Sequence, residues 1–278
     1  MNICNICPRL CNIDRNLENG NCKTKWDPVV SSVMVHRGEE PPISGSRGSG
    51  TVFFSGCNLG CVFCQNHDIS QTGSGTTVTI DEMVDIFHSL EAKGVHNINL
   101  VTPSHFVPPI AEAIKRSKER GVKIPFVYNS GGYDATHSLK LMEGLIDIYM
   151  PDMKYGSDVL GQRYSNVPDY FTVATQALKD MYRQVGAPEY ERGIMQKGLF
   201  VRHLVLPGQS GDSTAVLDWI KQNIPLAGVS LMAQYSPQYN ANEYEEINRR
   251  LTSGEYRKVE SHFKSIGLNE VYMQRIHN

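Results

Sequence analysis

The stretch Thr51–Asn66, TVFFSGCNLGCVFCQN, decides how this chain is interpreted. An apolar, strand-like run ends at Gly56 and is followed by Cys57, Cys61 and Cys64 in a C-x3-C-x2-C spacing. A structural zinc site is closed by four ligands, and a cubane iron–sulfur cluster usually takes four thiolates. Nothing nearby in the sequence offers a good fourth ligand. The three thiolates therefore predict a cluster with one iron left open, and that open iron is where chemistry can occur.

Composition limits the function classes. The 278 residues are 40% apolar, which is enough for a large core, and barrels of this length are commonly single domains. The net charge of −2 provides no basic surface for nucleic acid. No apolar run reaches the ~18 residues that span a membrane, and no signal-peptide pattern begins the chain. We expect a cytoplasmic protein without nucleic-acid or membrane partners, whose seven cysteines are reduced and available to metals.

The other four cysteines lie near the amino terminus. Cys4, Cys7, Cys11 and Cys22 have the spacing C-x2-C-x3-C-x10-C. Their segment has too few apolar residues to fold around a core of its own, so a metal would have to organise it. Zinc and an auxiliary [4Fe–4S] cluster both suit four cysteines, and the sequence leaves that choice open. We expect a cysteine-rich metal knuckle at residues 1–30, followed by a second unit at 31–278.

Apolar, strand-like runs alternate with helical segments after residue 50. The expected strands are Val52–Phe54, Ile98–Thr102, Ile124–Asn129, Leu145–Pro151, Phe200–Leu206 and Val229–Tyr235. The expected helices are Ile80–Lys93, Pro108–Arg120, Ala135–Gly144, Tyr170–Val185, Thr214–Asn223 and Asn242–Thr252. A further helix and a last run, Glu270–Arg275, are expected after residue 253, and Val29–His36 suits a strand or a helix equally. The repetition predicts an α/β fold on a parallel sheet, with six units forming a partial (β/α)6 TIM-like barrel.

Ligands of parallel βα folds bind at the carboxyl ends of the strands. Polar residues gather at those ends, namely Thr102, Ser104, His105, Asn129, Ser130, Asp152, Lys154, Arg202, His203 and Tyr235. For His105 and His203 a structural role and a role in the site are equally compatible with the sequence. Asp152 and Lys154 are two residues apart and also suit a simple ion pair at a strand end. Hydrolase motifs such as HEXXH and GXSXG are absent from the sequence.

The cysteine loop, with Phe63 directly before its last cysteine, resembles the signature of the radical S-adenosylmethionine (SAM) enzymes. Within them the chain is most similar to pyruvate formate-lyase activating enzyme and its uncharacterised relatives, which share a cysteine-rich segment before the loop. The resemblance implies a [4Fe–4S] cluster on Cys57, Cys61 and Cys64 whose open iron is chelated by SAM. It also implies one-electron cleavage of SAM to a 5′-deoxyadenosyl radical that abstracts a hydrogen atom, with an electron donor such as flavodoxin or ferredoxin.

The same resemblance implies the residues that contact SAM. Phe63 would border the adenine, and Thr102 with Ser104 stands where many relatives have Gly-Gly-Glu for the SAM amino group. Asp152-Met153-Lys154 resembles the Asp-Leu-Lys segment of the activating enzymes, and an ammonium such as that of Lys154 suits a carboxylate. The full set of candidates is Phe63, Thr102, Ser104, Asn129, Ser130, Asp152, Lys154, His203 and Tyr235.

The reaction implied by the resemblance is hydrogen abstraction from a backbone glycine of a partner, which becomes a glycyl radical enzyme. One alternative is radical modification of a small molecule or of another protein residue. Another is a non-catalytic iron–sulfur or zinc protein on the same fold. The barrel mouth and loops such as Tyr182–Gln196 are expected to select the substrate.

Overall fold

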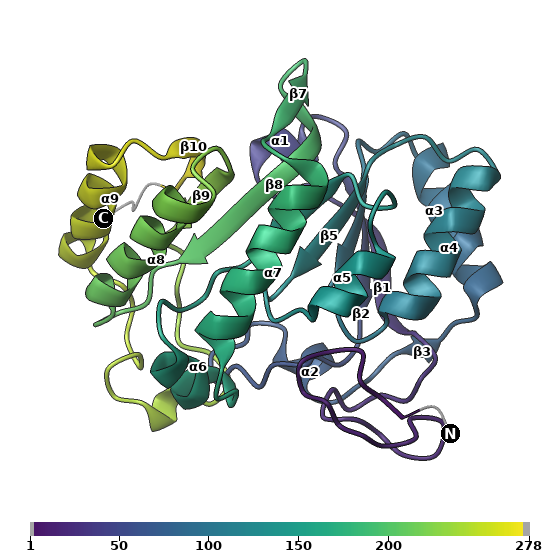
Figure 1. Ribbon diagram of the computed structural model, residues 1–278, viewed down its shortest axis with the longest axis horizontal. Coiled ribbons are helices and arrows are strands. Elements are labelled where there is room, and N and C mark those ends of the chain that lie inside the picture. The colour runs from purple at the N-terminus through teal and green to yellow at the C-terminus, as the bar shows by residue number, and fades with distance from the viewer. Residues whose placement is uncertain (1–2, 275–278) are drawn as a thin grey trace.

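Seven parallel strands form the centre of the part of the chain that the computed structural model describes, residues 3–274 (Figure 1). In spatial order they are β2 (Ser49–Phe54), β4 (Ile98–Val101), β5 (Phe126–Ser130), β6 (Ile148–Pro151), β8 (Ile194–Leu204), β9 (Gly228–Met232) and β10 (Asn269–Met273). All six predicted strands are present in this order. The partial TIM-like barrel is therefore confirmed, and β10 extends it by one further parallel strand.

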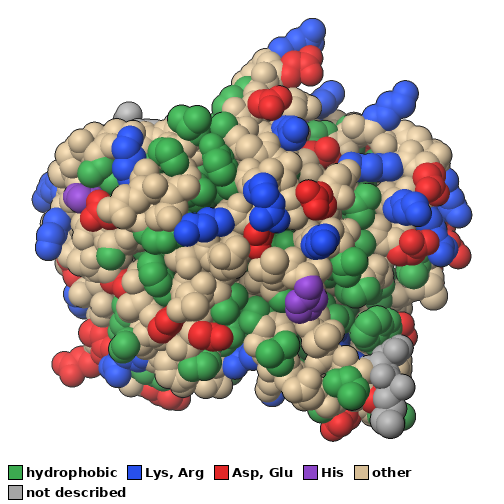
Figure 2. Space-filling model, viewed as in Figure 1, with side chains coloured by type: hydrophobic (Ala, Val, Ile, Leu, Met, Phe, Trp, Pro, Cys, Tyr) green, Lys and Arg blue, Asp and Glu red, His purple; other side chains and the backbone are tan. Residues whose placement is uncertain are grey.

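Three antiparallel strands extend the sheet. β1 (Val29–His36) pairs with β2, and β3 (Thr76–Thr77) pairs with β1, so the ambiguous run Val29–His36 is a strand. β7 (Glu189–Glu191) pairs with the start of β8 in a hairpin that projects from the molecule and bears charged side chains (Figures 1 and 2). This hairpin, which includes most of the predicted substrate-selecting loop Tyr182–Gln196, lies at the amino end of β8, opposite the cysteine loop and α2.

Helices cover the outer face of the sheet (Figure 1). They are α3 (Ile80–Ala92), α4 (Val107–Glu119), α5 (Thr136–Leu141), α6 (Asp158–Ser165), α7 (Tyr170–Val185), α8 (Ser210–Asn223) and α9 (Ser253–Ser265). The short α1 (Pro41–Ser44) and α2 (His67–Ser70) lie at opposite ends of the strands. The predicted capping box begins α3: Glu82 N–H donates to Thr79 Oγ1 at 3.2 Å, and Thr79 N–H to Glu82 Oε2 at 2.8 Å. None of the described helices is long and apolar enough to cross a membrane.

The predicted helix Asn242–Thr252 is wrong, because the segment forms turns after a short 3-10 helix, η1 (Ala241–Glu243). Side chains from other parts of the chain form hydrogen bonds with the backbone and side chains of this segment. Tyr235 Oη–H donates to the carbonyl of Ile247 at 2.7 Å, and Glu246 accepts from Arg163 and Tyr164. These long-range hydrogen bonds take the place of the backbone hydrogen bonds that a helix would form within the segment. Arg275, the end of the last predicted run, lies outside the described residues.

The amino-terminal segment, residues 3–27, packs against the carboxyl ends of the strands (Figure 1). It contains turns and one isolated bridge, Ile3 to Asp14, and no helix or longer strand in its described residues. Buried Arg15 donates to the carbonyl of His105 at 2.7 Å, and Arg9 donates to the carbonyl of Asn58 at 2.7 Å. The segment is thus bonded to the barrel at the end where the cysteine loop lies.

Candidate functional site

The cysteine loop connects β2 to α2. Cys61 Sγ lies 2.9 Å from Ser165 Oγ, Cys64 Sγ lies 3.2 Å from Ser70 Oγ, and the N–H of Leu59 donates to Cys57 Sγ at 3.4 Å. Burial raises the pKa of the Cys57 thiol, and the neighbouring Cys61 and Cys64 raise it further. Each of the three sulfurs therefore lies beside a hydrogen-bonding group that can support a thiolate.

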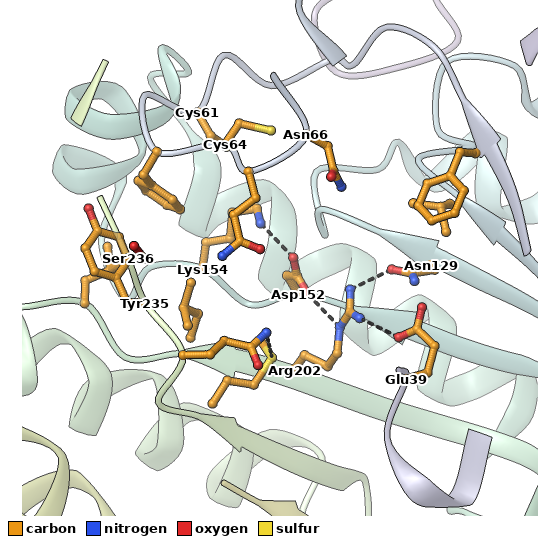
Figure 3. A pocket seen from close by; sticks show the side chains of 18 of the residues that line it. Glu39, Cys61, Cys64, Asn66, Asn129, Asp152, Lys154, Arg202, Tyr235 and Ser236 are labelled. Atoms are coloured by element: carbon orange, nitrogen blue, oxygen red, sulfur yellow. Dashed lines mark hydrogen bonds and ion pairs between the residues drawn. The ribbon is translucent and has the colours of Figure 1, made fainter. Parts of the chain in front are cut away.

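A cavity of about 440 Å³ opens beside Cys61 and Cys64 in the interior of the barrel (Figure 3). Its volume lies within the roughly 300–1,000 Å³ range of small-ligand and cofactor pockets. Its wall includes five of the nine candidate SAM contacts, which are Phe63, Asn129, Asp152, Lys154 and Tyr235. These five residues come from the cysteine loop and from the carboxyl ends of β5, β6 and β9, so the fold brings them together from distant parts of the chain.

A network of charged side chains crosses this cavity around Arg202 (Figure 3). Asp152 accepts from Lys154 Nζ at 2.7 Å and from Arg202 Nε at 2.9 Å, so one carboxylate joins two cations. Arg202 also donates from Nη2 to Asn129 Oδ1 at 2.6 Å and lies 3.4 Å from Glu39 Oε2. At most 19% of the side-chain surface of the four charged residues is exposed, and in such an environment each ion depends on its partners.

The network determines which groups are charged. Burial alone would raise the pKa of Asp152, but the cations of Arg202 and Lys154 outweigh it, and the pKa is lowered. Burial would lower the pKa of Lys154, but Asp152 and then the Cys61 thiol raise it. For Glu39 burial prevails over the attraction of Arg202, and its pKa is raised. The charged Lys154 ammonium thus lies near Cys61, at the end of the cavity next to the cysteine loop.

Residues 51–220, more than half of the 278-residue chain, match the Radical SAM superfamily. The chain belongs to the radical SAM superfamily. An uncharacterised protein of Methanocaldococcus jannaschii is 32% identical to it over 278 residues, covering 97% of this chain and 76% of that protein. Membership in the superfamily confirms the coarse expectation of a radical SAM enzyme that uses a [4Fe–4S] cluster and SAM.

Solved structures share the fold of this chain. SuiB from Streptococcus suis, in its structure bound to S-adenosylmethionine, has a TM-score of 0.56 and 12% identity, covering 80% of this chain and 48% of SuiB. A radical SAM methyltransferase from Sphaerobacter thermophilus has a TM-score of 0.54 and 15% identity, covering 84% of this chain and 68% of that protein. The chain therefore spans about half the length of SuiB.

The cysteine loop meets the requirements of the superfamily's cluster. Among residues 3–274, no three Cys, His, Asp or Glu side chains meet closely enough to hold a single metal ion. A cubane makes a different demand, because each thiolate binds its own iron rather than converging on one ion. Cys57, Cys61 and Cys64 would hold three irons of the cluster, and the adjacent cavity would receive the SAM bound to the fourth.

Four candidate SAM contacts of this radical SAM chain do not line the cavity, namely Thr102, Ser104, Ser130 and His203. Ser130 Oγ–H donates to Asp134 Oδ2 at 2.7 Å, and Ser104 is also bonded to the Asp134 carboxyl group. Thr102 directly follows β4 with φ +61°, a left-handed conformation that is costly for a β-branched residue.

The candidate histidines His105 and His203 form hydrogen bonds with backbone carbonyls and do not line the cavity. His203 Nδ1–H donates to the carbonyl of Met153 at 2.7 Å, and His105 Nε2–H donates to that of Ser55 at 2.9 Å. Burial lowers the pKa of His203 to about 4 and that of His105 to about 3, so both rings are neutral near pH 7. Through Met153, His203 fixes the backbone between Asp152 and Lys154.

Sequence reasoning missed several residues of the cavity. Arg202 was noted on its strand but received no role, His36 was given no role because it shares no ligand spacing with other histidines, and Glu39 and Asn66 were not considered. A signal for Arg202 existed, because alternation along β8 places it on the same face as Leu204, opposite His203. His36 and Glu39 had no such signal, since they reach the cavity only through the pairing of β1 with β2.

Aromatic rings line the wall next to the cysteine loop. Phe63 contacts Tyr235 edge-on at 5.8 Å between centroids and Tyr155 at 6.5 Å. Tyr155 Oη lies 2.7 Å from Ser165 Oγ, the hydroxyl that contacts Cys61. These buried rings leave little room for water beside the sulfurs, which suits a cluster that must be kept from solvent.

Proposed function

We propose that this protein binds SAM in the cavity beside Cys61 and Cys64 and abstracts a hydrogen atom from a backbone glycine of a partner protein. The observation that carries the proposal is that Phe63, Asn129, Asp152, Lys154 and Tyr235 line one cavity next to the cysteine loop. The pairing of a cluster loop with an Asp-Met-Lys segment supports the branch of pyruvate formate-lyase activating enzyme.

When bound, the [4Fe–4S] cluster and SAM supply a 5′-deoxyadenosyl radical through one-electron cleavage of the sulfonium. The residues of the chain bind and orient. Lys154 offers its ammonium to the SAM carboxylate, while Asp152 keeps that ammonium in place and accepts from the SAM amino group. Phe63 and Tyr235 provide aromatic surface for the adenine and exclude water from the radical.

Two observations support a protein substrate. The cavity, at about 440 Å³, lies in the lower half of the range for cofactor pockets, so SAM would take up much of it. The reacting carbon of the substrate would then enter from outside, as a flexible segment of a larger molecule can. In addition, SuiB of the same fold was crystallised with its precursor peptide SuiA.

The test is an anaerobic assay of the reconstituted protein. It is reduced with dithionite, supplied with SAM and assayed for 5′-deoxyadenosine, with and without a candidate glycyl radical enzyme. We expect product in both cases and a glycyl radical signal in electron paramagnetic resonance (EPR) when the partner is present. Absence of 5′-deoxyadenosine would refute the proposal, and product without any glycyl radical across candidate partners would favour modification of another substrate.

A further inference from the structure

The amino-terminal segment, residues 3–27, is built around its own cysteines. Cys4, Cys7 and Cys22 are at most 6% exposed, and Ile6 is the other buried apolar side chain of the described segment. A Cβ built on Gly20 would lie 3.2 Å from Cys22 Sγ and 3.6 Å from Cys11 Sγ, so these two sulfurs lie on either side of one small residue. The carbonyls of Cys4 and Cys7 accept from the N–H groups of Asn12 (3.0 Å) and Leu10 (3.1 Å), which flank Cys11. The turns of the segment thus gather the four cysteines, and all four are free of disulfides.

The backbone of this segment is strained beside the cysteines. Leu10 (φ +43°) and Asn12 (φ +54°) flank Cys11, and Lys23 (φ +66°) follows Cys22. A non-glycine residue in such a conformation costs about 1–3 kcal/mol and persists only where the surroundings enforce it. Local hydrogen bonds hold these turns, since Asn12 N–H donates to the carbonyl of Cys4 at 3.0 Å and Lys23 N–H to that of Gly20 at 2.9 Å. A metal bound by all four cysteines would hold them further.

The segment directly contacts the loop that carries the other three cysteines. The carbonyl oxygen of Cys22 packs on Gly56, the residue before Cys57, so closely that a Cβ on Gly56 would lie 2.1 Å from it. Arg9 donates from Nε to the carbonyl of Asn58 at 2.7 Å. One residue and one van der Waals contact therefore separate Cys22 from Cys57.

We propose that Cys4, Cys7, Cys11 and Cys22 bind a second iron–sulfur cluster, through which an electron enters the radical SAM loop. Four thiolates satisfy all four irons of a cubane, so this cluster has no open iron for SAM. Zinc would also satisfy four cysteines, but it has no redox chemistry, and the contact between Cys22 and Gly56 would then serve only structure. The contact joins two ligand sets and gives an electron a short path between them.

Cleavage of one SAM molecule takes one electron, which a protein electron donor must supply. Cys4, Cys7, Cys11 and Cys22 would hold a cluster that takes one electron from a reduced flavodoxin and passes the same electron to the cluster held by Cys57, Cys61 and Cys64. The net change is one electron from flavodoxin to SAM, with no proton required. The metal-binding half of the proposal stands on the cysteines alone, whereas the electron-transfer half rests on the SAM cleavage proposed above.

The first test isolates the amino-terminal site in the full chain. Cys57→Ala, Cys61→Ala and Cys64→Ala are combined and the protein is reconstituted with iron and sulfide under anaerobic conditions. We expect about eight irons per chain in the unchanged protein and about four in the triple variant, since each cubane holds four. The reduced triple variant should show a cluster EPR signal that added SAM leaves unchanged. Zinc in place of iron, or no metal, would overturn the proposal even if the unchanged protein cleaves SAM.

The second test concerns the electron path and uses Cys11→Ser, because Cys11 is the least buried of the four cysteines and Ser keeps a small polar group beside Asn21. SAM cleavage is measured with reduced flavodoxin and with dithionite, which is small enough to reach the radical SAM cluster directly. We expect the flavodoxin-to-dithionite ratio of rates to fall about tenfold or more, the usual loss for a residue that supports a metal site. An unchanged ratio would overturn the electron path. The SAM-sensitive EPR signal must persist, which excludes collapse of the radical SAM loop as the cause.

Discussion

At the scale of single residues, Lys154 connects the cluster end of the cavity with its charged network. Its ammonium lies 2.7 Å from Asp152 Oδ2. Burial raises the pKa of the Cys61 thiol, and Lys154 offsets part of that rise. A hydrogen bond to a charged group contributes about 1.5–3 kcal/mol, so Lys154→Gln should raise the Kd for SAM about ten- to hundredfold. Equilibrium dialysis of the reconstituted variant measures this change.

A matched control lies on the surface. Arg163 pairs with Glu246 at 2.7 Å, with 49% of the Arg163 side chain exposed, and it lies outside the cavity wall. Exposed ion pairs contribute about 0–1 kcal/mol, so Arg163→Gln should leave the Kd for SAM within about twofold. Equal losses in the two variants would show that Lys154 has no special part in binding SAM.

Gly56 allows the amino-terminal segment to contact the cysteine loop. Its φ is +78°, and a Cβ there would lie 2.1 Å from the carbonyl oxygen of Cys22, whereas Gly94 has φ +75° and no atom within 4 Å of a built Cβ. Both Gly→Ala changes carry the backbone strain, about 1–2 kcal/mol. Only Gly56→Ala also displaces Cys22, so it should destabilise the protein more than Gly94→Ala in urea unfolding. Equal destabilisation by the two changes would mean that the amino-terminal segment can move away from Gly56 without loss of unfolding free energy.

His203 makes stability depend on pH. Its pKa falls from an ordinary 6.5 to about 4 on folding, because burial disfavours the charged ring. The folded state thus binds the proton less readily than the unfolded state. The stability that the neutral ring contributes is complete above about pH 6.5 and is lost as the pH falls toward 4.

His203→Asn removes this titration, and its amide is placed to donate to the carbonyl of Met153 in place of Nδ1–H. Between pH 7.5 and pH 5 the unchanged protein should lose about 2 kcal/mol of unfolding free energy more than the variant does. Anaerobic urea unfolding at the two pH values gives this difference. Parallel losses in the two proteins would contradict the neutral, buried imidazole.

At the scale of elements, the capping box fixes where α3 begins. Replacing Thr79 with Ala removes the acceptor of the Glu82 N–H, and the loss should be about 1 kcal/mol of unfolding free energy. Thr175→Ala in α7 is the matched control, because its hydroxyl donates only to the carbonyl of Thr172 in the same helix. Alanine favours the helix interior, so the control should lose nothing. A similar loss in both would mean that the cap is not what stabilises α3.

Elements with a local signal were predictable, and those held by distant contacts were not. The apolar stripe and caps of α3 lie within its own sequence, as does the run of Ile98–Val101 in β4. By contrast, residues 242–252 have a helix-like pattern but give the carbonyl of Ile247 to Tyr235. The same limit applies to the site. The cysteines and Asp152 were found from spacing and strand ends, whereas Glu39 reaches the cavity through the pairing of β1 with β2.

At the scale of the whole molecule, both cysteine sets lie at one end of the barrel. The amino-terminal segment covers the carboxyl ends of the strands near the cysteine loop, while the projecting β7 hairpin lies at the other end (Figure 1). Arg15 joins the two parts, because it donates to the carbonyl of His105, whose ring donates to Ser55 at the end of β2. The segment is therefore bonded to the barrel surface, and the metal proposed for its cysteines would add to that attachment.

This contribution of the metal predicts that metal-free protein opens at its amino terminus alone. If metal binding supplies the folding free energy of residues 3–27, trypsin should cut the metal-free chain after Arg9, Arg15, Lys23 or Lys25 and leave the barrel as one large fragment. The reconstituted chain should resist cleavage there at least about tenfold longer, since bound metal lowers the open population. The triple variant at positions 57, 61 and 64 separates the two sites, because with iron at the amino terminus it should resist as well. Mass spectrometry of the fragments identifies the cut sites, and cleavage at the same rate with and without metal would mean that the barrel alone holds the segment in place.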